Sequence, residues 1–346
     1  MELTDNLNIR QFKPLIAPYL LKEELPADVQ VSKLVATTRK AIQDILTGKD
    51  KRRLVIVGPC SLHDCRATIE YAEKLMQLQQ RVDDKVLIIM RAYFEKPRTT
   101  LGWKGMIYDP HLDVSYDIEG GLRQARSLLL SIAKIGLPSA IEFLDPIVPQ
   151  YLADLVAWAA IGARTTESQI HRQMASGLSM PIGFKNSTDG NLTPAIDAIK
   201  AASSAHSFLG IDRNGQVVIA ETKGNQYGHI VMRGGSDCPN YASEYVAFVE
   251  VLLRKAGIST GLIIDCSHAN SQKDYKKQRI AFLDVAGQIQ QGNKLIAGVM
   301  LESFLNEGNQ PFTKPQDLKY GVSLTDSCIG WEETEELILD LSAKIQ

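Results

Sequence analysis

The sequence lacks most features that commit a chain to a membrane, to export or to a polyanionic partner. None of its apolar runs approaches the roughly 20 residues of a membrane-spanning helix. Its first residues contain no apolar core of a secretory signal. A net charge of -2 provides no overall field for nucleic acid or a membrane surface. We therefore expect a cytoplasmic protein that binds neither nucleic acid nor membrane.

The sequence is also poor in cysteine patterns. The five cysteines are odd in number and scattered, and no two of them form a CxxC pair. This argues against a disulfide framework and against a zinc knuckle. In a reducing compartment the cysteines are thiols, and some of them are available as metal ligands.

A strand–helix rhythm begins at Leu54 and runs to the C-terminus. Apolar segments alternate with amphipathic stretches of helical spacing, which favours parallel strands buried on both faces and joined by helices. The α/β fold that we expect is a (β/α)8 TIM barrel. An open doubly wound sheet is the alternative, but no GxGxxG follows the first strand. The expected strands are 54–60, 86–92, 139–145, 159–164, 181–186, 228–234, 261–266 and 295–302.

Two segments lie outside this rhythm. Residues 1–50 contain scattered prolines and then a helical pattern over 31–48, so we expect an N-terminal extension for subunit contact or regulation. The catalytic barrel is then expected over 51–346. Within it, residues 207–226 predict an inserted β-hairpin, because the pair Asn214-Gly215 lies between two strand-like runs.

Polar residues follow nearly every apolar run, at the end where a parallel barrel carries its catalytic groups. One set of them combines a thiol, an imidazole and two carboxylates. In a closed barrel the first and last strands are neighbours, so these donors can converge and hold a divalent ion such as Mn, Fe, Co or Zn. Considered alone, a free cysteine is more often simply buried, and a lone histidine is more often a core or capping residue. The set is Cys60, His268, Glu302 and Asp326.

A second set at the strand ends is cationic. Guanidinium groups match phosphate and carboxylate oxygens, and backbone amides at Gly162 and Ala163 add further donors. Some of these cations are expected to pair with acidic neighbours, but all six together imply substrates with several negative charges. With a metal that polarises a carbonyl, the two sets predict an enzyme acting on phosphorylated carbon compounds. The cations are Arg91, Lys96, Arg98, Arg164, Lys185 and Arg233.

Six segments closely resemble the class I 3-deoxy-D-arabino-heptulosonate 7-phosphate (DAHP) synthases. The resemblance runs from about Arg39 to the C-terminus, and one departure is Ser187, which stands where the family has glycine. The segments are GPCSLHD, RAYFEKPRTTLGWKG, IGARTTESQIHRQMASGLSMP, GFKNSTDGN, DCSHANSQKDYKKQ and ESFLNEGNQ.

The resemblance implies a barrel that condenses phosphoenolpyruvate with erythrose 4-phosphate and water, giving DAHP and phosphate, the first step of the shikimate pathway. It implies one divalent metal on the thiol–imidazole–carboxylate set. Lys96 would donate a proton, and either His268 or Glu142 would activate water. Phosphoenolpyruvate would be held by Arg91, Lys96, Glu142, Ala163, Arg164, Lys185 and Arg233, and erythrose 4-phosphate by Lys96, Pro97, Arg98 and Thr99.

Two rival functions are weighed against this one. A 3-deoxy-octulosonate 8-phosphate synthase is disfavoured by the KPRTT segment, and an inactive sensor barrel by the presence of every expected ligand. The resemblance further implies a homodimer or homotetramer inhibited by an aromatic amino acid. Tyrosine is favoured over phenylalanine or tryptophan, with Pro149, Gln150 and Ser179 as candidate effector contacts.

Overall fold

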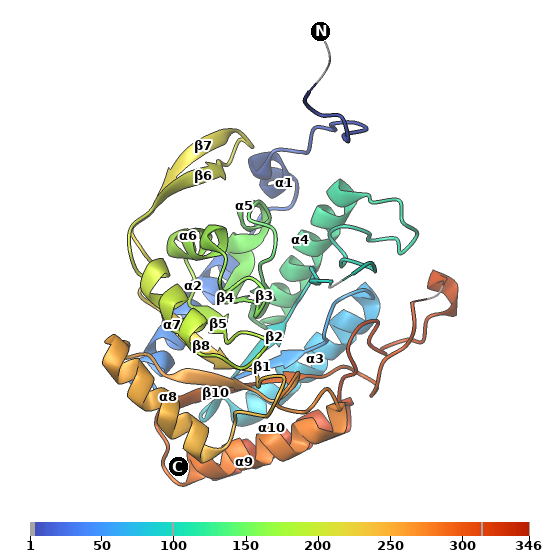
Figure 1. Ribbon diagram of the computed structural model, residues 1–346. Coiled ribbons are helices and arrows are strands. Elements are labelled where there is room, and N and C mark those ends of the chain that lie inside the picture. The colour runs from blue at the N-terminus through green and yellow to red at the C-terminus, as the bar shows by residue number, and fades with distance from the viewer. Residues whose placement is uncertain (1–3, 99, 313, 346) are drawn as a thin grey trace.

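The protein folds as a closed barrel of eight parallel strands surrounded by helices (Figure 1). This computed structural model describes residues 4–98, 100–312 and 314–345. Around the barrel the strands are ordered β1-β10-β9-β8-β5-β4-β3-β2. The strands are β1 (Arg53–Gly58), β2 (Val86–Arg91), β3 (Ser139–Glu142), β4 (Val156–Ile161), β5 (Ile182–Lys185), β8 (Gly228–Met232), β9 (Leu262–Asp265) and β10 (Ile296–Glu302). The predicted (β/α)8 fold is thereby confirmed.

Helices follow the strands and cover the outside of the barrel (Figure 1). None of them, within the described residues, is long and apolar enough to cross a membrane. The α-helices of this layer are α3 (Cys65–Val82), α4 (Ile118–Ile135), α5 (Pro149–Leu152), α6 (Gln169–Gly177), α7 (Thr193–Ala202), α8 (Ser243–Ala256), α9 (Gln278–Gln290) and α10 (Trp331–Lys344), with 3-10 turns η1 (Ala153–Leu155), η2 (Tyr275–Lys277) and η3 (Pro315–Asp317).

The barrel strands are apolar because both of their faces are covered. Inside the barrel, Ile56, Trp158 and Met300 belong to one buried cluster, and a second cluster fills the layer between strands and helices. Helix ends follow local rules. The side chain of Asp117 accepts a hydrogen bond from the Gly120 amide at the start of α4. The helix stops where Gly136 adopts a φ of 96°.

Strand register is the feature that positions the site. Closure of the barrel pairs β1 with β10, and Gly58 lies opposite Glu302. Cys60, two residues beyond Gly58, therefore emerges beside Glu302. Three predicted strand boundaries were wrong by three residues: the end of the strand expected at 139–145, which stops at Glu142, and both ends of the strand expected at 159–164. The strand expected at 159–164 is β4, which begins at Val156, because the apolar run already starts there and Trp158 belongs inside the barrel.

The N-terminal extension contributes two helices, α1 (Pro18–Glu24) and α2 (Val29–Leu46). The inserted hairpin is confirmed as β6 (Ser207–Ile211) and β7 (Val217–Glu221), which pair antiparallel outside the barrel. Figure 1 shows α1 beside this hairpin, and the Tyr19 amide donates to the carbonyl of Arg213 in its turn at 2.9 Å. The extension and the insertion thus meet each other at one side of the barrel.

Candidate active site

A pocket of about 490 Å³ lies at the carboxyl ends of the barrel strands. Loops after several strands supply its walls, as expected for a barrel enzyme. Thr99, one of the predicted residues, lies outside the described part of the chain. The other predicted substrate-binding residues all line it: Arg91, Lys96, Pro97, Arg98, Glu142, Ala163, Arg164, Lys185 and Arg233.

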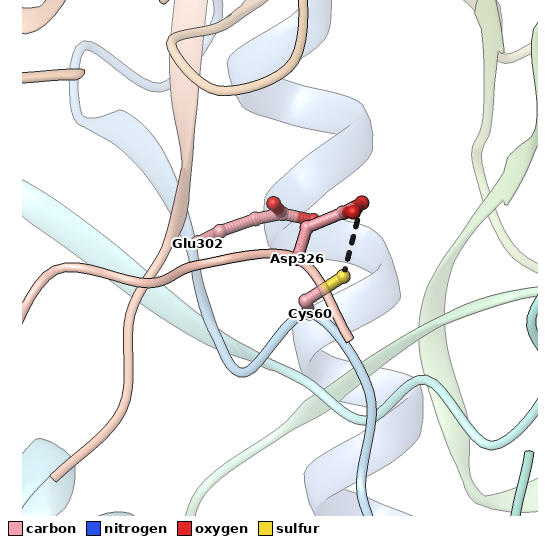
Figure 2. Close-up of side chains that lie close together, drawn as sticks. All are labelled: Cys60, Glu302 and Asp326. Carbon is pink, nitrogen blue, oxygen red and sulfur yellow. Dashed lines mark hydrogen bonds between the residues drawn. The ribbon is translucent and has the colours of Figure 1, made fainter. Parts of the chain in front are cut away.

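Three of the four predicted metal ligands form a cluster at one side of the pocket (Figure 2). Cys60, Glu302 and Asp326, called here the ligand cluster, each offer one atom within 4.8 Å of the others. The Cys60 thiol is 3.5 Å from Oδ2 of Asp326. Cys60 and Glu302 are buried, whereas Asp326 is exposed at the rim. The ligand cluster joins the loop after β1, the end of β10 and the loop before α10.

His268 lies next to the ligand cluster but is not one of the three. Its Nε2 is 3.8 Å from Oε1 of Glu302, and its Nδ1 is 2.9 Å from Oδ2 of Asp265. Its backbone has a φ of 56°, an uncommon value for a residue other than glycine. A carboxylate behind the imidazole fixes which nitrogen faces the cluster, and this arrangement is typical of metal-binding histidines.

The donor chemistry of the ligand cluster fits a divalent metal. Burial, together with the nearby Glu302 carboxylate, raises the pKa of the Cys60 thiol to about 12. Two carboxylates facing one thiol form an arrangement that a dication would stabilise, because it would favour the thiolate and offset the clustered negative charge. Thiolate, imidazole and carboxylate ligands together suit a transition metal rather than magnesium or calcium.

Arg91 connects the ligand cluster to the pocket. The side chain is fully buried, and its Nη2 donates to Oε1 of Glu302 at 2.9 Å. The guanidinium also packs over the ring of Tyr93, with Cζ 4.0 Å from the ring centroid. A guanidinium in this position holds the Glu302 carboxylate in one orientation and keeps a positive charge at the pocket floor.

Lys185 and Glu142 form a second buried ion pair. Nζ of Lys185 is 3.0 Å from Oε2 of Glu142 and 3.8 Å from Oδ2 of Asp265. Burial alone would raise the pKa of Glu142, but the nearby Lys185 ammonium is among the groups that lower it below its usual value. Pairing of some pocket cations with acidic residues was predicted, and Arg91 and Lys185 are both paired in this way.

Lys96 points from the loop after β2 toward the ligand cluster. Its Nζ is 3.0 Å from Sγ of Cys60 and 3.2 Å from the Cys60 carbonyl oxygen. Burial alone would lower the pKa of Lys96, but the thiol and carboxylates of the ligand cluster raise it above its ordinary value. The ammonium therefore stays charged between the ligand cluster and the substrate pocket.

Gly162 leaves space for the Glu142 carboxylate. An ideal Cβ at this position would lie 2.5 Å from Oε1 of Glu142, which is closer than side-chain carbons approach. The Gly162 carbonyl also accepts the amides of Thr165 and Thr166, which shapes the turn that carries Arg164. The predicted amide donors at 162–163 thus belong to a turn packed directly against a buried acid.

Arg233 is held by residues that the sequence reasoning did not single out. Its amide donates to Oδ1 of Asn186 at 2.8 Å, and Nδ2 of Asn186 donates to the Gly234 carbonyl at 3.0 Å. Asn240 in turn accepts from the Gly234 amide at 2.8 Å. The only sequence signal for Asn186 was its place just beyond the end of β5, which does not distinguish a buried amide from a ligand contact. Asn240 lies farther along the loop after β8 and had no such signal.

Ser187, the departure from the family pattern, is accommodated without a left-handed backbone. Its hydroxyl donates to the Asn191 carbonyl at 3.0 Å and also contacts the Asp189 carboxylate. The serine therefore closes the loop after Lys185 with side-chain hydrogen bonds.

Two of the three candidate effector contacts, Pro149 and Gln150, lie in α5, which contacts the N-terminal extension. Pro149 begins α5 and is buried, whereas Gln150 and Ser179 are exposed. The hydroxyl of Tyr151, in α5, donates to the Ile16 carbonyl at 2.6 Å. This bond ties α5 to the extension.

Several known proteins are similar to this sequence over nearly its whole length. The Phe-sensitive phospho-2-dehydro-3-deoxyheptonate aldolase of Escherichia coli strain K12 is 53% identical, over 99% of this chain and 97% of its own. The Tyr-sensitive enzyme of the same strain is 50% identical over 97% and 95%. The Trp-sensitive enzyme of Enterobacter agglomerans is 50% identical over 100% and 99%.

The fold is shared as well. The solved structure of phospho-2-dehydro-3-deoxyheptonate aldolase from Francisella tularensis SCHU S4 matches with a TM-score of 0.96 at 49% identity, covering 98% of this chain and 99% of that one. A family model described as the DAHP synthetase I family matches residues 28–339. On these grounds the chain belongs to the DAHP synthetase I family.

Proposed function

We propose that the protein condenses phosphoenolpyruvate with D-erythrose 4-phosphate and water, releasing DAHP and inorganic phosphate. The observation that carries this proposal is the convergence, in one pocket, of the cations Arg91, Lys185 and Arg233 with a ligand cluster suited to a metal. Two phosphorylated substrates need several cations, and an aldehyde acceptor needs an electrophilic activator. Both requirements are met in one pocket, where Arg91 directly contacts Glu302 of the ligand cluster.

The ligand cluster and His268 would hold one divalent metal. When bound, such an ion supplies Lewis acidity toward a carbonyl oxygen. Arg91 orients Glu302, and Asp265 orients His268, so these two ligands are positioned from behind by charged partners. We propose Mn, Fe, Co or Zn, because hard cations such as Mg prefer oxygen ligands alone.

We propose that Arg91, Arg164, Lys185 and Arg233 neutralise the charge of phosphoenolpyruvate, while Pro97, Arg98 and Thr99 serve erythrose 4-phosphate. Burial gives the pocket cations more electrostatic effect than they would have in water. With both anions held, C3 of phosphoenolpyruvate is oriented toward the aldehyde carbon, and part of the entropic cost of meeting is removed before reaction.

Lys96 is proposed to give a proton to the alkoxide that forms when the new carbon–carbon bond closes. Its charged ammonium lies between the pocket and the Cys60 thiol. Water then adds at C2, and the C2–O bond to phosphate breaks to release phosphate. Of the two candidate bases for that water, we favour Glu142 over His268, because the Nε2 of His268 faces the ligand cluster.

The test is product formation by the purified protein supplied with Mn²⁺, phosphoenolpyruvate and erythrose 4-phosphate. We expect DAHP by mass spectrometry and phosphate in a 1:1 ratio to it. Arabinose 5-phosphate, the acceptor of the octulosonate enzymes, should give little product. Absence of phosphate release with both substrates would favour the sensor barrel instead, and preference for arabinose 5-phosphate would favour the related synthase.

As effector we propose tyrosine, with phenylalanine and tryptophan as alternatives, acting near Pro149, Gln150 and Ser179. Relatives of all three sensitivities have similar identity to this chain, so sequence similarity does not choose among them. The bond from Tyr151 to Ile16 supports a regulatory role for residues 1–50. Inhibition assays with each amino acid identify the effector. Deletion of residues 1–30 should relieve inhibition while catalysis persists, because allostery needs two states of different affinity.

We further propose a homodimer or homotetramer. The outer face of the hairpin exposes Leu209, Val217 and Ile219, and the N-terminal segment exposes Leu7 and Phe12. Exposed apolar groups gathered in this way mark protein–protein contacts. Light scattering on a sizing column measures the mass, and a monomer at micromolar concentration would contradict the proposal.

A further inference from the structure

We propose that Tyr93 is a substrate-binding residue whose phenolic hydroxyl donates a hydrogen bond to an anionic oxygen of bound phosphoenolpyruvate. This inference rests on the proposed function and adds to it a residue that the sequence patterns did not assign. It concerns a neutral donor in a pocket whose lining combines charged side chains with other hydroxyl and amide groups.

The primary observation is a buried hydroxyl with no partner. Tyr93 is only 2% exposed, and among the described residues its hydroxyl oxygen has no hydrogen-bond partner. Leaving such a group unpaired is unfavourable, because it loses its hydrogen bonds to water and gains none in return. An unsatisfied polar atom in a native protein therefore indicates a group that is completed by something else.

Tyr93 lines the substrate pocket, so a bound substrate can supply the missing hydrogen-bond partner of its hydroxyl. The guanidinium carbon of Arg91 lies 4.0 Å from the ring centroid, and Nζ of Lys185 lies 5.7 Å from it. These two cations are proposed to hold phosphoenolpyruvate. An anion bound between them lies beside the phenol, and burial raises the pKa of Tyr93, so the hydroxyl remains a donor at neutral pH.

The backbone holds Tyr93 in a fixed place. Its carbonyl accepts the Leu62 amide at 2.9 Å, and the preceding residue, Ala92, donates its amide to the Ala140 carbonyl at 2.7 Å. The loop after β1 and strand β3 thus hold the backbone of this segment from two sides. A donor fixed before the ligand arrives costs little entropy at binding.

Two other tyrosines, Tyr71 and Tyr108, differ from Tyr93 because their hydroxyl groups have hydrogen-bond partners within the protein. The Tyr71 hydroxyl, equally buried, donates to Oγ of Ser303 at 2.8 Å, and Tyr108 donates to the carboxylates of Glu95 and Asp145. Tyr71 does not line the pocket. It is therefore the matched control, a buried tyrosine whose hydroxyl serves the protein itself.

The experiment is Tyr93→Phe, with Tyr71→Phe as control, in metal-loaded full-length protein. Affinity for phosphoenolpyruvate is measured by calorimetry without erythrose 4-phosphate. Tyr93→Phe should raise the Kd roughly tenfold or more, since hydrogen bonds to charged groups are the stronger class. It should leave the melting temperature of the ligand-free protein unchanged or higher, because it removes an unpaired polar atom. Tyr71→Phe should lower the melting temperature and leave the Kd within twofold.

A Tyr93→Phe protein that binds phosphoenolpyruvate within twofold of wild type overturns the inference, even if its kcat falls. If either variant fails to fold, a structure of the wild-type protein with phosphoenolpyruvate decides. A ligand oxygen within hydrogen-bond distance of the Tyr93 hydroxyl supports the inference, and its absence overturns it. A wild-type protein that forms no DAHP refutes the proposed function and the inference together, whereas active wild type with normal Tyr93→Phe binding refutes the inference alone.

Discussion

Gly162→Ala is expected to damage catalysis while leaving the protein folded. The new methyl group would be placed 2.5 Å from Oε1 of Glu142, whereas ordinary contact begins at 3.4 Å. The carboxylate must therefore retreat by roughly 1 Å, and displacements of that size among positioning groups cost about 100-fold in rate. Its other oxygen is bonded to Lys185, so the ammonium moves or loses its partner.

The measured quantity is kcat/KM for phosphoenolpyruvate, which should fall between about 10-fold and 100-fold. Unfolding in urea reports the separate cost of overpacking, about 1–3 kcal/mol. Gly287→Ala is the control, because an added Cβ there meets nothing within 4 Å and the residue is inside α9. That variant should gain about 0.4–1 kcal/mol in stability at unchanged activity.

One result would refute the reasoning. If folded Gly162→Ala retains kcat/KM within twofold, the Glu142 carboxylate either moves without consequence or is not needed for catalysis. In the first case a structure of the variant would show Glu142 displaced and Lys185 still in contact with substrate. In the second, replacing Glu142 itself with Gln should also leave the rate unchanged.

Four further outcomes are expected. Cys60→Ala should carry little metal by elemental analysis and turn over poorly, and full metal content at wild-type rate would contradict the ligand assignment. Arg164→Lys should raise the KM for phosphoenolpyruvate, and Arg98→Lys the KM for erythrose 4-phosphate, because lysine keeps the charge but loses the bidentate guanidinium geometry. If both variants changed the KM of the same substrate, the assignment of one arginine to each substrate would be wrong. Burial lowers the pKa of His229 from 6.5 to about 4. Because the unfolded chain then takes up a proton that the folded protein does not, the free energy of unfolding should fall by about 3 kcal/mol as the pH falls from 6.5 toward 4. In urea titrations, His229→Gln should not show this pH-dependent decrease. Metal-free enzyme should inactivate in air through a Cys60–Cys328 disulfide, because Cys328 lies two residues beyond Asp326, whose Oδ2 is 3.5 Å from the Cys60 thiol; peptide mapping that finds no such link would disprove it.

The sequence predicted the barrel because its strands are covered on both faces and therefore appear as continuous apolar runs. It also predicted that Cys60 and Glu302 would meet, since closure makes the first and last strands neighbours. Strand ends were less accurate. The strand expected at 54–60 stops at Gly58, because the following residues turn into the pocket.

Other parts of the site were outside the reach of sequence patterns. The pairing of Arg91 with Glu302 depends on side-chain direction in a closed barrel, which periodicity does not describe. His268 reaches its place through a left-handed backbone, which is uncommon for a residue other than glycine and which hydrophobic periodicity does not predict. The unpaired hydroxyl of Tyr93 is visible only when every neighbouring donor and acceptor has been located.

The pairing of Gly58 with Glu302 also bears on when this protein becomes functional during its synthesis. Cys60 and Asp326 are separated by 266 residues, so the complete ligand cluster cannot exist until the ribosome has released almost the whole chain. A contact that spans such a distance forms slowly, because a very long loop must close first. A nascent or truncated chain ending before β10 should therefore neither bind metal at this site nor turn over substrate, and metal uptake can serve as a signal that the barrel has closed.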